Sequence, residues 1–351
     1  MLFLDLGEDR AELLGERVLA AVRSPTMVGG ERIDLTISIG AAVYDGGLET
    51  AESLLQQADV AMYEAKAVGG DAFRVHHPHM STAAVERFQM RNDLRDAFEG
   101  GALDLHYQPL VRLSDGQVVG AEALLRWNDG ARGTMPPPAF VRVAEESGLI
   151  VPIGAWVVRE ACRQSRIWRE AGLPPLRMAV NVSVRQFVNG DILNDVIEAL
   201  RESGLDSHRL EIEITEGIVL SDSARVRGVL ISLAGMGVRI AVDDFGAGYS
   251  SFTSISELPI QTLKVDRCFV GRMSEIPESR AITRTIVDLG HHLHLVTIAE
   301  GVETAEQLTL LKKMRCTEAQ GFLFSPAVPA DEFPAVMRRL HADAAEEREL
   351  V

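Results

Sequence analysis

Polar side chains recur close to the ends of the apolar, β-like runs of this sequence. One such residue would be unremarkable, but seven consecutive runs carry one, which core packing alone does not produce. Burying an ion among apolar residues costs several kcal/mol unless a partner or a metal compensates for it. We therefore expect these side chains to form one functional site, and they are Glu122, Asn181, Glu213, Asp243 with Asp244, Lys264, Glu300 and Gln320.

Several of these residues are of the types that hold hard divalent cations. Glu122, Asn181, Glu213 and Asp243 offer oxygen ligands, which suit Mg²⁺ or Mn²⁺ far better than zinc. Asp244 directly follows Asp243, so the pair suits two neighbouring metals with Asp243 as a bridge. Two metals about 3.5–4 Å apart can generate a hydroxide and stabilise an in-line displacement at phosphorus. The residue types therefore predict two-metal phosphoryl chemistry.

Two further residues have roles that the sequence leaves open. Lys264 could orient the attacking water or neutralise charge on the phosphate. Glu300 could ligate the second metal or accept a proton from the water. Taken singly, Glu122 has an ordinary alternative as a helix cap or ion-pair partner, Asn181 as a turn residue and Lys264 as a structural ion-pair partner. Only as a set do they favour a site strongly.

The elements that must position these residues alternate between short β-like runs and longer helical patterns. The β-like runs cover 103–111, 118–127, 177–184, 210–216, 238–246, 262–270, 295–303 and, more weakly, 317–324. The helical patterns between them cover 139–149, 156–172, 190–204, 224–237, 279–293 and 304–314. Such alternation over about 240 residues indicates a doubly wound sheet or a closed barrel.

The barrel is the better interpretation. About 250 residues is the usual size of an eightfold barrel. No glycine-rich phosphate fingerprint follows the first β-like run, which weakens the doubly wound alternative. In a barrel of parallel strands the strand ends converge on one face, where barrel active sites are built.

The sequence also predicts how the regions on either side of the barrel are organised. Residues 1–78 form one unit, with helical patterns at 11–22 and 50–69, a turn-rich stretch at 24–34 and a β-rich run at 35–44. Residues 79–90 are a linker leading into a helix, whose pattern starts at Val85. Residues 91–340 are the barrel domain, and residues 341–351 an acidic, solvated helical tail.

Composition excludes several classes of function. The net charge of −16 disfavours binding to a polynucleotide. No apolar stretch is long enough to span a membrane, and the acidic start does not resemble a secretory signal, so we expect a cytoplasmic protein. Cys162, Cys268 and Cys316 are scattered, which argues against a disulfide framework or a zinc cluster. His291, His292 and His294 lack metal-ligand spacing, and we expect surface or capping roles.

The ordered motifs from about Leu94 to about Phe333 resemble the EAL domain, the family of cyclic di-GMP phosphodiesterases. Glu122-Ala123-Leu124 stands inside AEALLRW. The other matching motifs are YQPL, NVS, EITE, DDFGAGYSS, LKVD, AEGVE and QGFLFS. The match implies a modified (β/α)8 barrel with one reversed strand and cleavage of cyclic di-GMP to linear pGpG. Homodimers through helices near the DDFG loop are common in such relatives, and we expect one here.

The resemblance also implies residue roles. It assigns the first of two Mg²⁺ or Mn²⁺ ions to Glu122, Asn181, Glu213 and Asp243, and the second ion to Asp244. It implies that Lys264 is the catalytic lysine and that Glu300 is an acid–base or metal-linked glutamate. Glu216 corresponds to the residue that braces the DDFG loop, and substrate contacts fall to Gln108, Arg126 and Gln320. The segments after Trp127 and Gln320, and Gly217, depart from the usual pattern without touching a metal ligand.

Residues 1–78 resemble the second half of a GGDEF domain, the cyclic di-GMP synthase module. SIGAAVY and ADVAMYEAK carry this resemblance, which gives an α+β fragment. The signature loop is missing, and Gly29-Gly30-Glu31 lies in the wrong place to replace it. We therefore expect no cyclase activity.

Two rival functions remain open. The chain could sense cyclic di-GMP without cutting it, as degenerate relatives do after losing metal ligands. It could also be an unrelated metal-dependent barrel enzyme such as a lyase, although that leaves the combination of DDFGAGYSS and AEGVE unexplained.

Overall fold

The computed structural model describes most of the chain and divides it into two compact units, Met1–Asp93 and Leu94–Val351. The described residues are 8–23, 26–28, 31–33, 36–44, 50–67, 70–130, 133–220, 224–246 and 258–349. Helix α3 (Pro78–Glu99) contains the boundary between the units and begins earlier than the expected start at Val85. No helix among the described residues combines the length and the apolar character needed to cross a membrane.

The first unit is a small α+β fragment, as expected. Its elements are α1 (Glu8–Val22), β1 (Thr26–Val28), β2 (Glu31–Ile33), β3 (Ile39–Ala41), α2 (Ala51–Ala67) and β4 (Phe73–Val75). Strands β3 and β4 pair in parallel around a core that includes Leu19 and Phe73. The stretch expected to be turn-rich instead contains the antiparallel pair β1 and β2. Strands of three residues carry too little alternation to be predicted from sequence.

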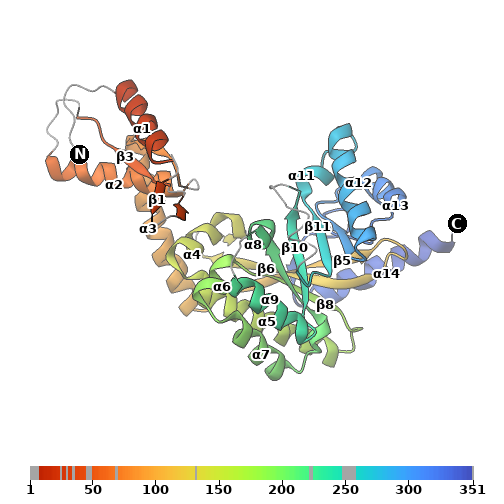
Figure 1. Ribbon diagram of the computed structural model, residues 1–351. Helices are drawn as coiled ribbons and strands as arrows, with labels where there is room; N and C mark the ends of the chain where they lie inside the picture. Colours follow the sequence, from red (N-terminus) through yellow and green to blue (C-terminus); the bar gives the residue numbers. More distant parts are fainter. Residues whose placement is uncertain are drawn as a thin grey trace. The chain divides into compact units, whose positions relative to one another are not determined.

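The second unit is a closed barrel of eight strands surrounded by helices (Figure 1). The strands are β5 (Leu103–Arg112), β6 (Val118–Asp129), β8 (Arg177–Asn181), β9 (Leu210–Thr215), β10 (Arg239–Phe245), β11 (Thr262–Val265), β12 (Val296–Ala299) and β13 (Glu318–Ala319). Two short strands extend the sheet, β7 (Gly133–Met135) on β6 and β14 (Val328–Pro329) on β5.

One strand runs against the others, which confirms the expected reversal and identifies the strand. Strand β5 pairs antiparallel with both β6 and β13, whereas the neighbours from β6 through β8 to β13 are parallel. The reversal follows from the short connection between β5 and β6, where Gly116 adopts a φ of 68°. A connection this short can join only antiparallel strands, because a parallel pair needs a crossover of a dozen or more residues.

Helices connect the parallel strands along the outside of the barrel. They are α4 (Val141–Ser147), α5 (Ile150–Glu170), α6 (Val184–Asn189), α7 (Ile192–Ser203), α8 (Glu216–Leu220), α9 (Ala224–Gly235), α11 (Arg267–Val270), α12 (Pro277–His292), α13 (Ala305–Met314) and α14 (Phe333–Glu349), with 3₁₀ turns at Pro137–Ala139 and Ser207–Arg209. Ser183 and Thr304 begin α6 and α13 with capping boxes. Helix α14 continues unbroken through residue 341, and Ala344 is buried.

The barrel interior is layered. Leu110, Ala179 and Ile298 come from three strands that are not neighbours, and they pack together as an apolar layer. Glu211 and Glu213 lie two residues apart on β9, are fully buried, and contact different sets of residues. Because side chains on a strand alternate between its faces, both point into the barrel. The interior therefore contains two polar layers, one toward each end of the strands.

Candidate active site

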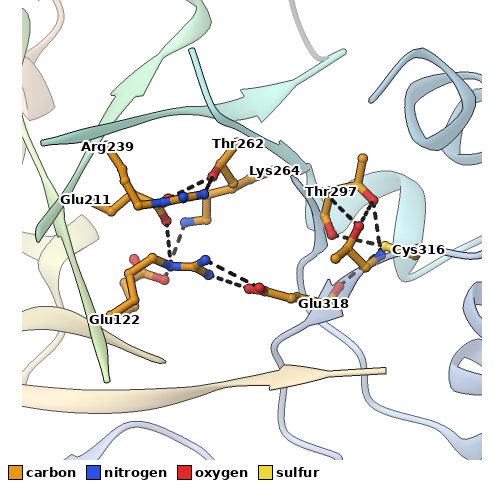
Figure 2. Close-up of polar contacts among 10 residues, drawn as sticks. Glu122, Glu211, Arg239, Thr262, Lys264, Thr297, Cys316 and Glu318 are labelled. Atoms are coloured by element: carbon orange, nitrogen blue, oxygen red, sulfur yellow. Dashed lines mark hydrogen bonds and ion pairs between the residues drawn. The ribbon is translucent and has the colours of Figure 1, made fainter. Parts of the chain in front are cut away.

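Lys264 occupies the centre of the polar layer near the carboxyl ends of the strands. Its side chain is fully buried on β11. Its Nζ lies 2.7 Å from Glu300 Oε1, 2.8 Å from Glu213 Oε2, 3.3 Å from Asp243 Oδ1 and 3.4 Å from Glu122 Oε2. One ammonium thus contacts four carboxylates from four other segments of the barrel. Figure 2 shows Lys264 and Glu122 in this interior.

The charges in this layer do not balance, and the pKa values respond accordingly. Burial would lower the pKa of Lys264, but the surrounding carboxylates, Asp243 foremost, raise it well above its usual value. Burial, together with the charge of Glu122, raises the pKa of Glu213 well above its usual range. Burial, opposed by Lys264, raises the pKa of Glu300 to about 8. One cation is insufficient for four carboxylates, of which Glu122 and Glu213 are buried, so the layer favours additional positive charge.

Amide side chains hold Glu122 in place. Asn181 Nδ2 donates to Glu122 Oε1 at 2.7 Å, and Gln320 Nε2 donates to Glu122 Oε2 at 2.6 Å. Gln320 Nε2 also lies 2.9 Å from Gln108 Oε1, and Gln108 Nε2 donates to the Ser325 carbonyl. Burial would raise the pKa of Glu122, but Lys264 and these amide donors lower it overall. These contacts therefore keep Glu122 ionised despite its burial.

The pair Asp243-Asp244 forms a sharp turn at the end of β10. Asp244 has a φ of 52°, and its backbone N–H donates to Asp243 Oδ1 at 3.0 Å. A left-handed conformation is uncommon outside glycine but tolerated by aspartate. Burial and the charges of Asp243 and Asp266 raise the pKa of Asp244 to about 6. The turn thus brings two adjacent carboxylates into the same small region.

The donor set fits divalent metal ions. One carboxylate oxygen from each of Asp243, Asp244 and Glu300 lies within 4.8 Å of the others. Within the described part of the chain, Glu213 Oε1 is buried and has no hydrogen-bond partner. A buried carboxylate oxygen without a donor is costly, and a cation bound beside it would satisfy it. Oxygen donors of this kind suit hard cations such as Mg²⁺ and Mn²⁺.

Two other expected residues lie outside this cluster. Glu216 begins α8 and its Oε2 accepts a hydrogen bond from the Gly246 backbone N–H at 3.1 Å. This contact ties Glu216 to the residue that ends the DDFG turn. Residues 247–257, the remainder of that expected loop, fall outside the described residues. Arg126 lies on β6 near the cluster, and its Nη1 donates to the Leu125 carbonyl at 2.9 Å.

The structure adds residues to which sequence reasoning gave no role. Asp266 caps α11 by accepting the Cys268 N–H at 2.6 Å, and its charge helps raise the pKa of Asp244. The sequence could have indicated Asp266 as a site residue, because it follows β11 two residues after Lys264. It could not have indicated the Ser325 carbonyl that accepts from Gln108, since a backbone carbonyl carries no residue-specific signature. His291 and His292 each contact a backbone carbonyl, of Arg315 and Asp288 respectively.

Comparison with known families gives two matches. Residues 91–327 match the model described as "EAL domain", and residues 5–72 match that described as "Diguanylate cyclase, GGDEF domain". The second match is confined to the first unit.

Curated relatives extend this picture. The chain is 38% identical over 325 residues to the bifunctional diguanylate cyclase/cyclic di-GMP phosphodiesterase MucR of Pseudomonas aeruginosa, covering 93% of this chain and 47% of the relative. It is 34% identical over 342 residues to the cyclic di-GMP phosphodiesterase NbdA of the same organism, covering 97% and 44%. The chain therefore spans less than half the length of these relatives.

Solved structures agree with the barrel. A structure described as the PaMucR phosphodiesterase in complex with c-di-GMP is 41% identical, with a TM-score of 0.68, and covers 70% of this chain and 99% of that chain. A structure of the EAL enzyme Bd1971, bound to cAMP and cyclic di-GMP, is 29% identical, with a TM-score of 0.70, and covers 82% and 76%.

Proposed function

This chain belongs to the EAL-domain family, and on that premise we propose that it hydrolyses cyclic di-GMP to linear pGpG. The observation that supports this most directly is the convergence of Glu122, Glu213, Asp243 and Glu300 on one face of the barrel around Lys264. A phosphodiester brings further negative charge to that face. Its binding therefore requires cations between the two sets of charge.

Two divalent ions, Mg²⁺ or Mn²⁺, complete the site in this proposal. Bound there, they supply an activated water and neutralise charge on the scissile phosphate. Glu122, Asn181, Glu213 and Asp243 would hold one ion, and Asp244 would hold the other together with Asp243. Asn181 must turn its carbonyl oxygen toward the ion, which its hydrogen bond from Nδ2 to Glu122 already favours.

The remaining residues orient substrate and move protons. Lys264 keeps its positive charge because its pKa is raised, so it can stabilise charge on the phosphate or orient the water. Burial, with the charges of Asp243 and Glu122, raises the pKa of Glu300 to about 8, which suits either proton acceptance or metal ligation. The guanidinium of Arg126 suits a phosphate oxygen pair, because its planar fork donates two hydrogen bonds.

Positioning falls to three further side chains. Gln108 and Gln320 form a buried amide pair beside Glu122, and we assign them to substrate contact. Glu216 braces the DDFG turn through the Gly246 N–H. We also propose a cytoplasmic location and a homodimer through the barrel domain, as expected from the sequence.

A sensor that binds cyclic di-GMP without cutting it is the alternative. Such proteins lose metal ligands, whereas Glu122, Asn181, Glu213, Asp243 and Asp244 are all present in this chain. Hydrolysis is therefore favoured. We propose no cyclase activity for the first unit, and incubation with GTP should yield no cyclic di-GMP.

The decisive experiment follows linear pGpG after purified protein is mixed with cyclic di-GMP and Mn²⁺ or Mg²⁺. Product should form with metal and not with chelator. Glu122→Ala and Asp243→Asn should each lower kcat by at least about 100-fold, because removing a direct ligand exceeds the effect of losing an outer partner. Glu306→Gln, an exposed carboxylate on α13, is the matched control and should retain full turnover. Binding without product in the unaltered protein would favour the sensor.

A further inference from the structure

The opposite end of the barrel contains a pocket that the proposed reaction does not use. The pocket has a volume of about 540 Å³. Its lining includes Val118, Arg177, Arg239, Val296 and Glu318, each the first residue of its strand. The proposed active site lies at the other ends of these same strands. The pocket therefore lies at the amino-terminal mouth of the barrel, with the apolar layer between it and the proposed active site.

The pocket is rich in guanidinium groups although the chain as a whole is acidic. Arg112, Arg177, Arg209 and Arg239 line it, against a single lining carboxylate, Glu318. The rest of the polar lining is formed by Gln117, His208 and His341. In a chain with a net charge of −16, this local excess of cations is the opposite of the general trend.

A buried ion-pair network fixes the floor of the pocket. Glu211 Oε1 lies 3.1 Å from Arg177 Nε, and Glu211 Oε2 lies 3.0 Å from Arg239 Nε and 2.7 Å from Thr262 Oγ1. Arg177 also pairs with Glu318. Figure 2 shows Glu211, Arg239 and Thr262 together in this arrangement, with Glu318 nearby. Arg239 remains 27% exposed, so part of its guanidinium faces the pocket.

Arg209 is the least compensated of the four arginines. Its Nη1 donates to the Pro175 carbonyl at 2.9 Å. Across the described ranges, no carboxylate lies within ion-pair distance of its side chain, whereas Arg112 pairs with Asp115 at 2.8 Å. A guanidinium has five N–H donors, so Arg209 retains donors for a ligand. Glu211 is already shared between Arg177 and Arg239, and Glu318 pairs with Arg177.

Histidine contacts add a further donor. His341 Nε2 accepts a hydrogen bond from the Val118 backbone N–H at 3.0 Å. An imidazole whose Nε2 accepts carries its proton on Nδ1, so His341 has one N–H left to donate. The remaining walls, formed by Pro174, Pro175, Leu176 and Val296, are apolar. The pocket therefore combines apolar walls with N–H groups on its floor and rim that can donate hydrogen bonds to an anion.

We propose that this amino-terminal mouth binds a small phosphomonoester, with the phosphate held by Arg209 and Arg239 and an apolar group against the proline-rich wall. Planar guanidinium forks match the paired oxygens of a phosphate. The volume lies within the range of about 300–1,000 Å³ that is typical of small-ligand sites. A nucleoside monophosphate has both required parts. This site is independent of cyclic di-GMP hydrolysis, because it shares no residue with the proposed active site.

The test measures binding of adenosine 5′-monophosphate, and of inorganic phosphate, to the full chain after metals have been removed. Calorimetry should give a single site for the unaltered protein. Arg209→Glu should weaken binding by at least about 10-fold, since hydrogen bonds to charged groups are worth that much. Arg169→Glu is the matched control, because Arg169 likewise donates to a backbone carbonyl, that of Gly204, but does not line the pocket.

Two comparisons make the outcome decisive. Binding should survive Arg126→Ala on the active-site face, and loss of binding there instead of in Arg209→Glu would move the anion to the catalytic end and overturn the proposal. Absence of binding to the unaltered protein, or equal weakening in Arg209→Glu and Arg169→Glu, would also overturn it. Arg209→Ala, which removes the donors without adding a charge, replaces Arg209→Glu if circular dichroism shows that the latter is unfolded.

Discussion

At the residue scale, the central feature is a single lysine that forms ion pairs with four carboxylates. Lys264 is fully buried and contacts Glu122, Glu213, Asp243 and Glu300. A buried ion is tolerated only when its partners compensate for lost hydration. Here the dependence is mutual, because the carboxylates also need the ammonium. The lysine therefore supports the fold of the site as well as its proposed chemistry.

This dependence predicts the effect of Lys264→Met. In metal-free protein, the free energy of unfolding should fall by about 3–5 kcal/mol, the usual cost of breaking a buried ion pair. Added Mg²⁺ should restore more stability to this variant than it adds to the unaltered protein, because the ion replaces the missing positive charge. Urea unfolding with and without metal measures both effects.

Lys313→Met provides the control for that experiment. Lys313 is exposed on α13, so its replacement should change the free energy of unfolding by no more than about 0.5 kcal/mol. Equal losses in the two variants would contradict the role given to Lys264, as would a Lys264→Met protein as stable as the parent.

At the element scale, the site depends on close packing inside the barrel. Gly120 lies on β6 and faces the interior, where a Cβ would come within 2.8 Å of the Arg177 carbonyl and 3.1 Å of Leu110 Cδ1. Glu122 follows two residues later on the same strand face. Strand β6 can thus approach β5 and β8 closely only because a side chain is absent at this position.

Gly120→Ala should therefore destabilise the barrel by about 1–3 kcal/mol, the usual cost of overpacking a core. The same substitution at Gly228, in the interior of α9 with open space around it, should stabilise by about 0.5–1 kcal/mol because alanine favours a helix. Chemical denaturation of both variants checks the opposite signs. A stabilised Gly120→Ala protein would show that the strands can separate without cost.

At the scale of the whole molecule, the distribution of charge determines where cations and anions are expected to bind. The net charge is −16, and four of the acids converge beside Lys264. Divalent metals should therefore stabilise the folded chain, because they bind the assembled carboxylates and not the dispersed ones of the unfolded state. The amino-terminal pocket, with its four arginines, is the local exception to this acidity.

Metal removal should consequently lower the melting temperature. At a free metal concentration about 100 times Kd, binding contributes about 2.7 kcal/mol to stability. That corresponds to roughly 5–10 °C in a domain of this size. Differential scanning calorimetry at matched ionic strength, with Mg²⁺ or with chelator, measures the shift. Asp243→Asn should show no metal-dependent shift, and an equal shift in that variant would place the bound metal elsewhere.

The sequence by itself determined the barrel class and the places of its strands along the chain, and it predicted polar site residues that the structure brings together around Lys264. It could do so because the end of a strand is a local sequence pattern. A charged residue within an apolar run, such as Lys264 or Glu213, also implies that an opposite charge or a metal compensates for its burial, wherever that partner lies in the sequence. The motifs added a family whose match the comparisons confirm. Some strands are shorter than expected, as at β13, because the apolar residues that continue the run there leave the sheet in a turn, where Phe322 is exposed.

Only the tertiary structure decided which residues meet. Lys264 contacts Glu122, which lies more than 140 positions away in the sequence, and no local pattern encodes that pairing. The structure also identified β5 as the reversed strand, placed Asp266 beside Asp244, and gathered arginines from four segments at the opposite mouth. Closure of the sheet creates both ends of the barrel at once, and contacts between strands distant in sequence arise only from that closure.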